Sequence, residues 1–130
     1  MEGETQKKIL IVEDEPLLGN LLKQRLDREN FSVMLVRDGE EAFRTIQGIF
    51  VPDLVLLDII LPKISGFELM ERINKDPQLS GVHIPIVIVS NLGQEGDVRR
   101  GQDLGAIGYF VKAQLSIEDL VSRVKEFFAS

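Results

Sequence analysis

The sequence contains no cysteine and a single histidine, His83. It can therefore form no disulfide, thiolate nucleophile or cysteine-based zinc site, and it lacks the ligands for a histidine-rich metal site. It also has no run of lysine and arginine, and its formal net charge is −6. Nucleic acids and anionic membranes bind clustered basic side chains, so we expect direct binding to neither.

Long apolar stretches are absent as well. No segment approaches the roughly 20 residues that cross a membrane. Residues 1–6 are acidic and polar and lack the apolar region of a signal peptide, which predicts a cytoplasmic protein. With 130 residues, of which 44% are hydrophobic and 28% charged, the chain suits one domain with one core.

Short apolar runs rich in β-branched residues are typical of buried parallel strands. Four such runs cover residues 8–12, 54–57, 86–89 and 109–111, and a further short strand is expected at 31–36. Apolar residues at helical spacing follow each strand. The predicted helices cover about residues 16–26, 39–46, 65–73, 93–104 and 116–128.

The segment 93–104 is the weakest of these helix predictions, because it holds three glycines and few apolar anchors. We expect it to be a mobile element. The five β/α units predict an α/β fold, with a five-stranded parallel sheet covered by helices on both faces. The expected strand order is 2-1-3-4-5, the flavodoxin-like, doubly wound arrangement.

Polar residues stand where the apolar runs end. Glu13 and Asp14 follow the first run, Asp58 follows the third strand, Ser90 the fourth and Lys112 the fifth. Ligands of open α/β sheets bind beyond the carboxyl ends of the strands, at the point where the strand order reverses. Here that point lies between the first and third strands, so the three carboxylates should converge there.

Three converging carboxylates would repel one another and raise each other's pKa values. A hard divalent cation, Mg²⁺ or Mn²⁺, would remove this repulsion. Asp58 would keep one oxygen free to act as a nucleophile, while Lys112 and Ser90 supply the cation and the hydroxyl that phosphoryl oxygens require. The sequence has no Walker-type glycine loop, so nucleotide hydrolysis is not indicated.

Each of these residues has an ordinary interpretation when taken alone. Asp58 and Ser90 could cap a turn or a helix, Lys112 could be a surface charge, and Tyr109 could be a half-buried strand residue. The acidic run at 13–16 could be a solvated helix start. The joint pattern at successive strand ends favours the functional interpretation.

Three segments resemble the receiver domain of two-component response regulators of the chemotaxis-regulator type. Residues 9–16 resemble the opening acidic motif of that family. Residues 52–58, followed by Leu61-Pro62 and Gly66, resemble its phosphoacceptor motif, and residues 105–112 resemble its switch-and-lysine motif. The resemblance implies a single receiver domain in residues 1–130, with a core at about 7–128.

The resemblance further implies that Asp58 accepts a phosphoryl group from the phosphohistidine of a sensor histidine kinase or a phosphotransfer protein. Glu13 and Asp14 would bind Mg²⁺ together with Asp58 and the backbone carbonyl of Ile60. The domain would be a signalling module, with self-catalysed phosphoryl transfer and autodephosphorylation as its only chemistry, rather than an enzyme.

By the same resemblance, Lys112 and Ser90 would contact the phosphoryl group, and Tyr109 would be the switch aromatic whose orientation follows Ser90. The output would be contact with a downstream protein. The loop 105–108 lacks the acidic pair of the family branch that dimerises through its last helices, and no DNA-binding segment follows Ser130. We therefore expect no transcription-factor dimer of that type.

Two residues depart from the family pattern. Ala113 replaces the proline that usually follows the lysine, and Asn91 replaces a small residue beside the hydroxyl. Because a non-proline cis bond costs about 2.5–4 kcal/mol, we predict a trans Lys112–Ala113 bond. We expect the Ile60 side chain at the mouth of the site, opposite Asn91, where it would exclude water.

Two other hypotheses stay open at this point. The departures at Ala113 and Asn91 allow a degenerate receiver that binds partners without taking phosphate. An enzyme of another flavodoxin-like class, binding a flavin or a phosphate ester, is the third possibility. The absence of a hydroxyl- and glycine-rich phosphate loop after the first strand argues against it.

Overall fold

The computed structural model describes residues 6–48, 50–79 and 81–129. Residues 1–5, which belong to the acidic segment discussed above, lie outside this description. Strands and helices alternate along the described chain. They are β1 (Lys8–Val12), α1 (Pro16–Arg28), β2 (Ser32–Val36), α2 (Gly39–Gly48), β3 (Leu54–Leu57), α3 (Gly66–Lys75), β4 (Ile86–Ser90), α4 (Glu95–Asp103), β5 (Gly108–Val111) and α5 (Ile117–Ala129), with 3-10 turns η1 (Pro77–Leu79) and η2 (Lys112–Gln114).

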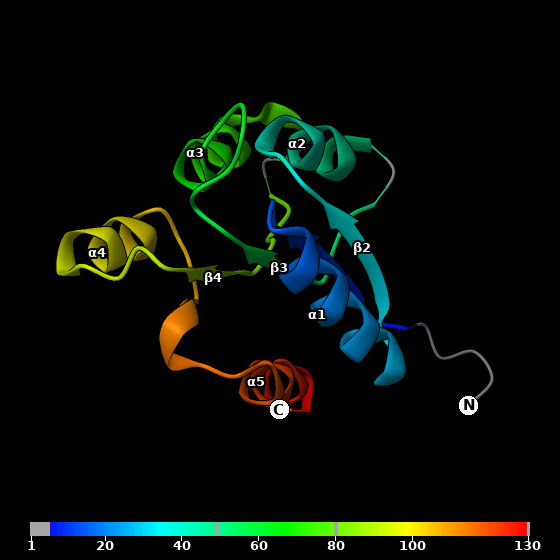
Figure 1. Ribbon diagram of the computed structural model, residues 1–130. Coiled ribbons are helices and arrows are strands. Elements are labelled where there is room, and N and C mark those ends of the chain that lie inside the picture. Colours follow the sequence, from blue (N-terminus) through cyan, green and yellow to red (C-terminus); the bar gives the residue numbers. More distant parts are fainter. Residues whose placement is uncertain (1–5, 49, 80, 130) are drawn as a thin grey trace.

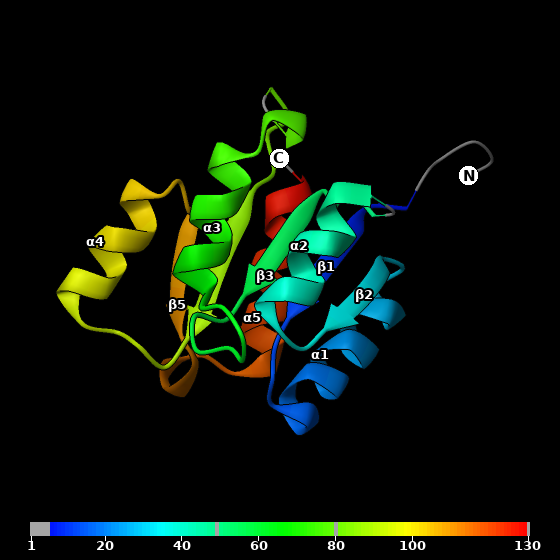
Figure 2. The same cartoon turned by 90° about the horizontal axis from the view of Figure 1, so that it is seen from above.

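The five strands form one parallel sheet in the order β2-β1-β3-β4-β5, which confirms the predicted topology. Figure 1 shows α2 and α3 on one face of the sheet and α1 and α5 on the other, with α4 out beside the β4–β5 edge. The view from above in Figure 2 shows the same separation of α4 from the other helices. In the described ranges, no helix has the length and apolar character that crossing a membrane requires.

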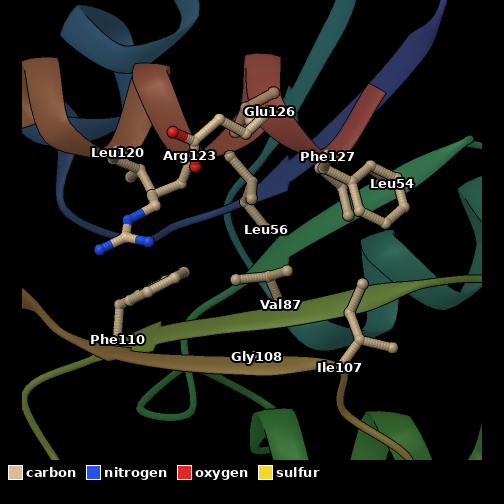
Figure 3. Close-up of a pocket in the computed structure, with 11 residues that line it drawn as sticks. Leu54, Leu56, Val87, Ile107, Gly108, Phe110, Leu120, Arg123, Glu126 and Phe127 are labelled. Atoms are coloured by element: carbon tan, nitrogen blue, oxygen red, sulfur yellow. The ribbon is translucent and has the colours of Figure 1, made fainter. Parts of the chain in front are cut away.

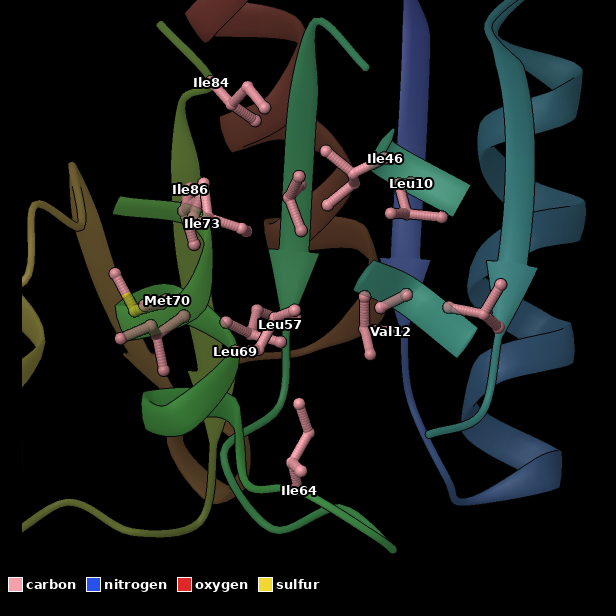
Figure 4. Close-up of a cluster of buried hydrophobic side chains, with 14 of the residues drawn as sticks. Leu10, Val12, Ile46, Leu57, Ile64, Leu69, Met70, Ile73, Ile84 and Ile86 are labelled. Carbon is pink, nitrogen blue, oxygen red and sulfur yellow. The ribbon is translucent and has the colours of Figure 1, made fainter. Parts of the chain in front are cut away.

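Both faces of the central strands are buried, which explains why their sequences are continuous apolar runs rather than alternating patterns. On one face, Leu10, Val12 and Leu57 pack with residues of α2 and α3, including Ile46 and Leu69 (Figure 4). Alternate residues of the same strands point to the other face and meet α1 and α5. They are Ile9, Ile11, Leu54 and Leu56, with Leu22, Leu26, Leu120 and Val124 on the helices.

Polar side chains cap the starts of α2, α3 and α5, and Oδ2 of Asp97 accepts the N–H of Gln94 (3.3 Å) at the start of α4. The Oδ1 atom of Asp38 accepts the N–H of Glu41 (2.7 Å) before α2, and Ser65 Oγ accepts the N–H of Glu68 (3.1 Å) at the start of α3. Ser116 does the same for Asp119 (3.0 Å) at α5. These bonds satisfy N–H groups that the first helical turn leaves free.

The leucines of α1 divide between two environments. Leu22 and Leu26 are buried, whereas Leu17 is 79% exposed and Leu21 42% exposed. The buried stripe of α1 therefore runs through Gly19, Leu22 and Leu26, which lie three and four residues apart on one helical face. The other leucines leave an apolar surface at the start of α1.

An apolar pocket of about 290 Å³ lies between the sheet and α5 (Figure 3). Val87 and Phe110 of the sheet line one side, and Leu120 and Phe127 of α5 line the other. None of the candidate site residues lines this pocket, so the predicted chemistry does not take place there.

Candidate functional site

The register of β1 and β3 brings two carboxylates to the same edge of the sheet. Val12 is paired with Leu57, and the N–H of Asp58 donates to the carbonyl of Val12 (3.0 Å). Glu13 and Asp58 therefore leave neighbouring strands at the same level. Both side chains are largely buried, with residue exposures of 5% and 6%.

Lys112 follows β5 and reaches across to both acids. Its Nζ atom lies 2.8 Å from Oδ2 of Asp58, and 2.9 Å and 3.1 Å from Oε1 and Oε2 of Glu13. The lysine side chain is only 13% exposed. The ammonium group thus bridges two carboxylates in a partly desolvated place, where charge interactions are stronger than in water.

Backbone N–H groups also donate to both carboxylates. The Oδ1 atom of Asp58 accepts the N–H of Ile60 (3.2 Å), and Oε2 of Glu13 accepts the N–H of Glu15 (3.0 Å). Both acids are thereby oriented by the loops that follow their own strands. The Asp58 carboxylate is therefore held in one orientation at the floor of the site.

Burial and hydrogen bonding shift the pKa values of Glu13 and Lys112. Burial raises the pKa of Glu13, and the hydrogen bond from Lys112 offsets only part of that rise. For Lys112, burial alone would lower the pKa, but the hydrogen bonds to Asp58 and Glu13 outweigh it and raise the pKa above the ordinary lysine value. Lys112 is therefore a cation at neutral pH.

The site opens into a cleft of about 400 Å³. Four of the lining residues are acidic and one is basic. The lining comprises Glu13, Asp14, Glu15, Pro16, Asp58, Ile60, Asn91 and Lys112. Asp14 and Asn91 are exposed, and Ile60 is 59% exposed, so these side chains form the rim while Glu13 and Asp58 form the floor.

The oxygen atoms of this cleft fit a hard divalent cation. Glu13, Asp14 and Asp58 all line it, and carboxylates, a carbonyl and water are the ligands that Mg²⁺ takes. Within the described part of the chain, however, no three acidic or histidine side chains are gathered closely enough to enclose a metal. The predicted convergence of three carboxylates is therefore only partly confirmed, because Glu13 and Asp58 meet at Lys112 while Asp14 is exposed at the rim. A cation here would be held from one side and would keep several waters, as Mg²⁺ commonly does.

Ser90 and Tyr109 are connected through the loop after β4 rather than through the cleft. Ser90 is fully buried, and its Oγ atom accepts the N–H of Leu92 (3.3 Å). The hydroxyl of Tyr109 donates to the carbonyl of the same Leu92. Burial, followed by the charges of Asp97 and Asp58, raises the pKa of Tyr109, so this hydroxyl keeps its proton at neutral pH.

Both departures from the family pattern lie close to the cleft. Asn91 stands on its rim. The Lys112–Ala113 bond is trans, as predicted, and Lys112 begins the short turn η2.

Sequence reasoning missed two residues beside these groups. Glu15 lines the cleft, and the signal for it was its place in the acidic run after β1. Gly101 of α4 lies against the ring of Tyr109, since a Cβ atom at Gly101 would come 3.2 Å from Cδ2 of that ring. No sequence signal distinguishes this glycine from the other glycines in and around α4.

Comparison with known proteins gives a consistent result. The family model described as the response regulator receiver domain matches residues 9–125. The phosphate regulon transcriptional regulatory protein PhoB of Rhizobium meliloti is 39% identical over 118 residues, which are 91% of this chain and 50% of PhoB. A probable transcriptional regulator, ycf27, of Guillardia theta is 36% identical over 122 residues, 94% of this chain and 45% of that protein.

Solved structures agree with these relatives. A CheY-like response regulator receiver domain protein from Methanospirillum hungatei JF-1 superposes with a TM-score of 0.82 at 28% identity, covering 94% of this chain and 93% of that one. The BeF₃-activated N-terminal receiver domain of RstA from Klebsiella pneumoniae gives 0.79 at 29% identity, covering 92% and 96%. The chain spans about half the length of the two curated relatives named above.

Proposed function

Because the chain belongs to the response regulator receiver domain family of two-component systems, we propose that Asp58 is its phosphoacceptor. The donor would be the phosphohistidine of a sensor histidine kinase or of a phosphotransfer protein. One observation supports this most strongly. Asp58 lies at the floor of an open acidic cleft, oriented by a lysine on one oxygen and a backbone N–H on the other.

The remaining roles follow from the chemistry of phosphoryl transfer. Glu13, Asp14, Asp58 and the backbone carbonyl of Ile60 would hold Mg²⁺, or Mn²⁺, on the acidic side of the cleft. The bound cation would neutralise the charge of the carboxylates and of the incoming phosphoryl oxygens. Lys112 would stabilise the phosphoryl group from the opposite side.

Ser90 would act after the transfer. Its hydroxyl now accepts a hydrogen bond from Leu92, so turning it toward a phosphoryl oxygen would break that bond. The carbonyl of Leu92 holds Tyr109, and Tyr109 packs on Gly101 of α4. Phosphorylation would thus reach α4 through Ser90, Leu92 and Tyr109, which is the kind of two-state element that switching requires.

The extent of the domain, its location and its downstream effector are also part of the proposal. Residues 7–128 would form one receiver domain in the cytoplasm, with no chemistry beyond its own phosphorylation and dephosphorylation. The curated relatives named above are transcriptional regulators, so a downstream effector is expected for this chain too. We propose that this effector is a protein contacting the α4–β5–α5 surface, rather than nucleic acid bound directly.

A degenerate receiver that binds partners without taking phosphate is the second candidate. Asn91 on the rim of the cleft and Ala113 after Lys112 are the observations that favour it. Asn91 could crowd the path of the phosphoryl group. The family membership itself argues against the third possibility, an enzyme of another flavodoxin-like class.

Intact mass measurement separates the two candidates. Wild-type protein incubated with Mg²⁺ and acetyl phosphate should gain the mass of one phosphoryl group, and Asp58→Asn should gain none. No gain in either protein, including with a phosphohistidine donor, would favour the degenerate receiver. An equal gain in both proteins would place the phosphoacceptor elsewhere.

A further inference from the structure

The side chain of Glu15 makes neither a capping hydrogen bond nor an ion pair with another described residue. It occupies the N-cap position of α1, yet its carboxylate makes no capping hydrogen bond there. It is exposed, and no ion pair joins it to another described residue. Glu15 nevertheless is one of the residues that line the cleft containing Asp58.

The backbone of Glu15 is held in place by the site. Its N–H donates to Oε2 of Glu13 (3.0 Å), and Pro16 follows it as the first residue of α1. Proline fixes its own φ and restricts the residue before it to an extended conformation, which is the conformation of Glu15 (φ −77°, ψ 110°). The side chain therefore starts from a fixed point at the rim.

The charges around the cleft are unbalanced. Four acidic residues line it, Glu13, Asp14, Glu15 and Asp58, against one basic residue, Lys112. Glu13 and Asp58 are bonded to the ammonium of Lys112, and a bound divalent cation would offset the charge near Asp14 and Asp58. The charge of Glu15 remains uncompensated, at the edge where a donor molecule enters and its leaving group departs.

We propose that Glu15 sets the preference of this domain among phosphoryl donors, disfavouring donors that are strongly anionic or that release an anion. This inference rests on Asp58 being the phosphoacceptor. Donors in which phosphorus is bonded to nitrogen, such as a phosphohistidine, would be repelled less than acyl phosphates. Glu15 would thereby help to restrict phosphorylation to nitrogen-linked protein donors.

The two transfers differ in charge. In each, an oxygen of Asp58 forms a bond to phosphorus while the bond from phosphorus to the leaving atom breaks, and the electron pair of that bond stays on the leaving atom. Acetyl phosphate enters with two negative charges and leaves as acetate, an anion. Phosphoramidate enters as a zwitterion with one net negative charge, because its nitrogen is already protonated, and it leaves as neutral ammonia.

The test compares the rate constants for both donors in wild type and in Glu15→Gln, at saturating Mg²⁺ and low ionic strength. A unit charge about 9 Å away through water changes the rate of entry of a dianion by a factor of about 5. The net charge of phosphoramidate is half as large, so the same unit charge changes its rate of entry by a factor of about 2. Glu15→Gln should therefore raise the acetyl phosphate rate about fivefold and the phosphoramidate rate about twofold.

Two controls isolate the local charge. Glu126→Gln makes the same chemical change on α5, at the apolar pocket rather than at the cleft, and should alter neither rate. At about 1 M salt, where the Debye length is about 3 Å, the effects of Glu15→Gln should largely vanish. A steric or folding effect of the substitution would persist in salt.

The outcomes separate this inference from the proposed function. If the wild type reacts with both donors and Glu15→Gln changes neither rate, or changes both by the same factor, Glu15 does not select donors. If Glu126→Gln has the same effect as Glu15→Gln, net charge rather than the rim carboxylate is responsible. If the wild type reacts with neither donor and not with a phosphohistidine donor either, the proposed function itself fails.

Discussion

Helices α3 and α4 follow neighbouring strands, yet they are attached to the sheet in different ways. α3 buries Phe67, Leu69, Met70 and Ile73 against the core, and the side chain of Ser65 caps its start. α4 buries one residue, Gly101, and its other side chains are half-buried or exposed. The stability of α3 therefore comes from apolar packing, while α4 depends on a few contacts at its edge.

The contacts of α4 lead toward the site. Gly101 lies against Tyr109, whose hydroxyl donates to the carbonyl of Leu92. The Cζ atom of Arg100 lies 4.4 Å from the centre of the Phe67 ring in α3. Segments that move in switching come from the least stable parts of a fold. From this difference we expect α3 to be a fixed support for the loop after Asp58, and α4 to be the helix that responds to phosphorylation.

The largest expected effect is the loss of stability when a buried side chain of α3 is shortened. Leu69 is fully buried, so Leu69→Ala should lower the free energy of unfolding by about 2–5 kcal/mol. Val98 of α4 is only half-buried, and Val98→Ala should cost less than about 1 kcal/mol. Urea unfolding of both variants gives the two values, and equal losses would remove the distinction between the helices.

The next largest effect is a difference in stability between alanine substitutions at two glycines of α4. A Cβ atom at Gly101 would come 2.7 Å from Cδ1 of Ile88, a fully buried side chain, so Gly101→Ala should cost about 1 kcal/mol even after its gain in helix propensity. A Cβ atom at Gly96 meets no atom within 4 Å, so Gly96→Ala should stabilise by about 0.4–1 kcal/mol. The thermal unfolding temperatures of the two variants should shift in opposite directions. A stabilising Gly101→Ala would show that Gly101 does not pack closely on Ile88 and Tyr109.

The smallest effect concerns the contact between α3 and α4. Arg100→Ala removes the cation–π contact with Phe67 and the weak ion pair with Glu71 (3.6 Å), and should cost about 0.5–1 kcal/mol. Arg99→Ala breaks only an exposed pair with Glu95 within α4 and should cost less than about 0.5 kcal/mol. Equal values from denaturant unfolding would mean that Arg100 does not join the two helices.

Sequence reasoning predicted the sheet well because buried strands and their polar ends leave strong signals. The apolar runs gave the strand order, and the polar residues after them gave Glu13, Asp58 and Lys112, which the structure brings together. It could not tell which leucines of α1 are buried, because Leu17, Leu18, Leu21 and Leu22 all fit helical spacing.

Other features depend on single side-chain orientations that no sequence pattern encodes. The hydroxyl of Ser90 could face the cleft or the loop after β4. Only the structure shows that it accepts a hydrogen bond from the N–H of Leu92. The packing of Tyr109 on Gly101 depends on the position of α4. The sequence likewise did not show that Glu15 makes no capping bond, because acidic residues commonly cap helices.

Hydrogen exchange with and without a phosphoryl mimic tests the central claim most directly. Beryllofluoride and Mg²⁺ added to the wild-type protein should change amide exchange in residues 93–104 and around Tyr109, while α3 stays unchanged. Asp58→Asn should show no change in either helix. Equal changes in α3 and α4, or changes confined to α1 and α2, would contradict the account of α4 as the element that responds to Asp58.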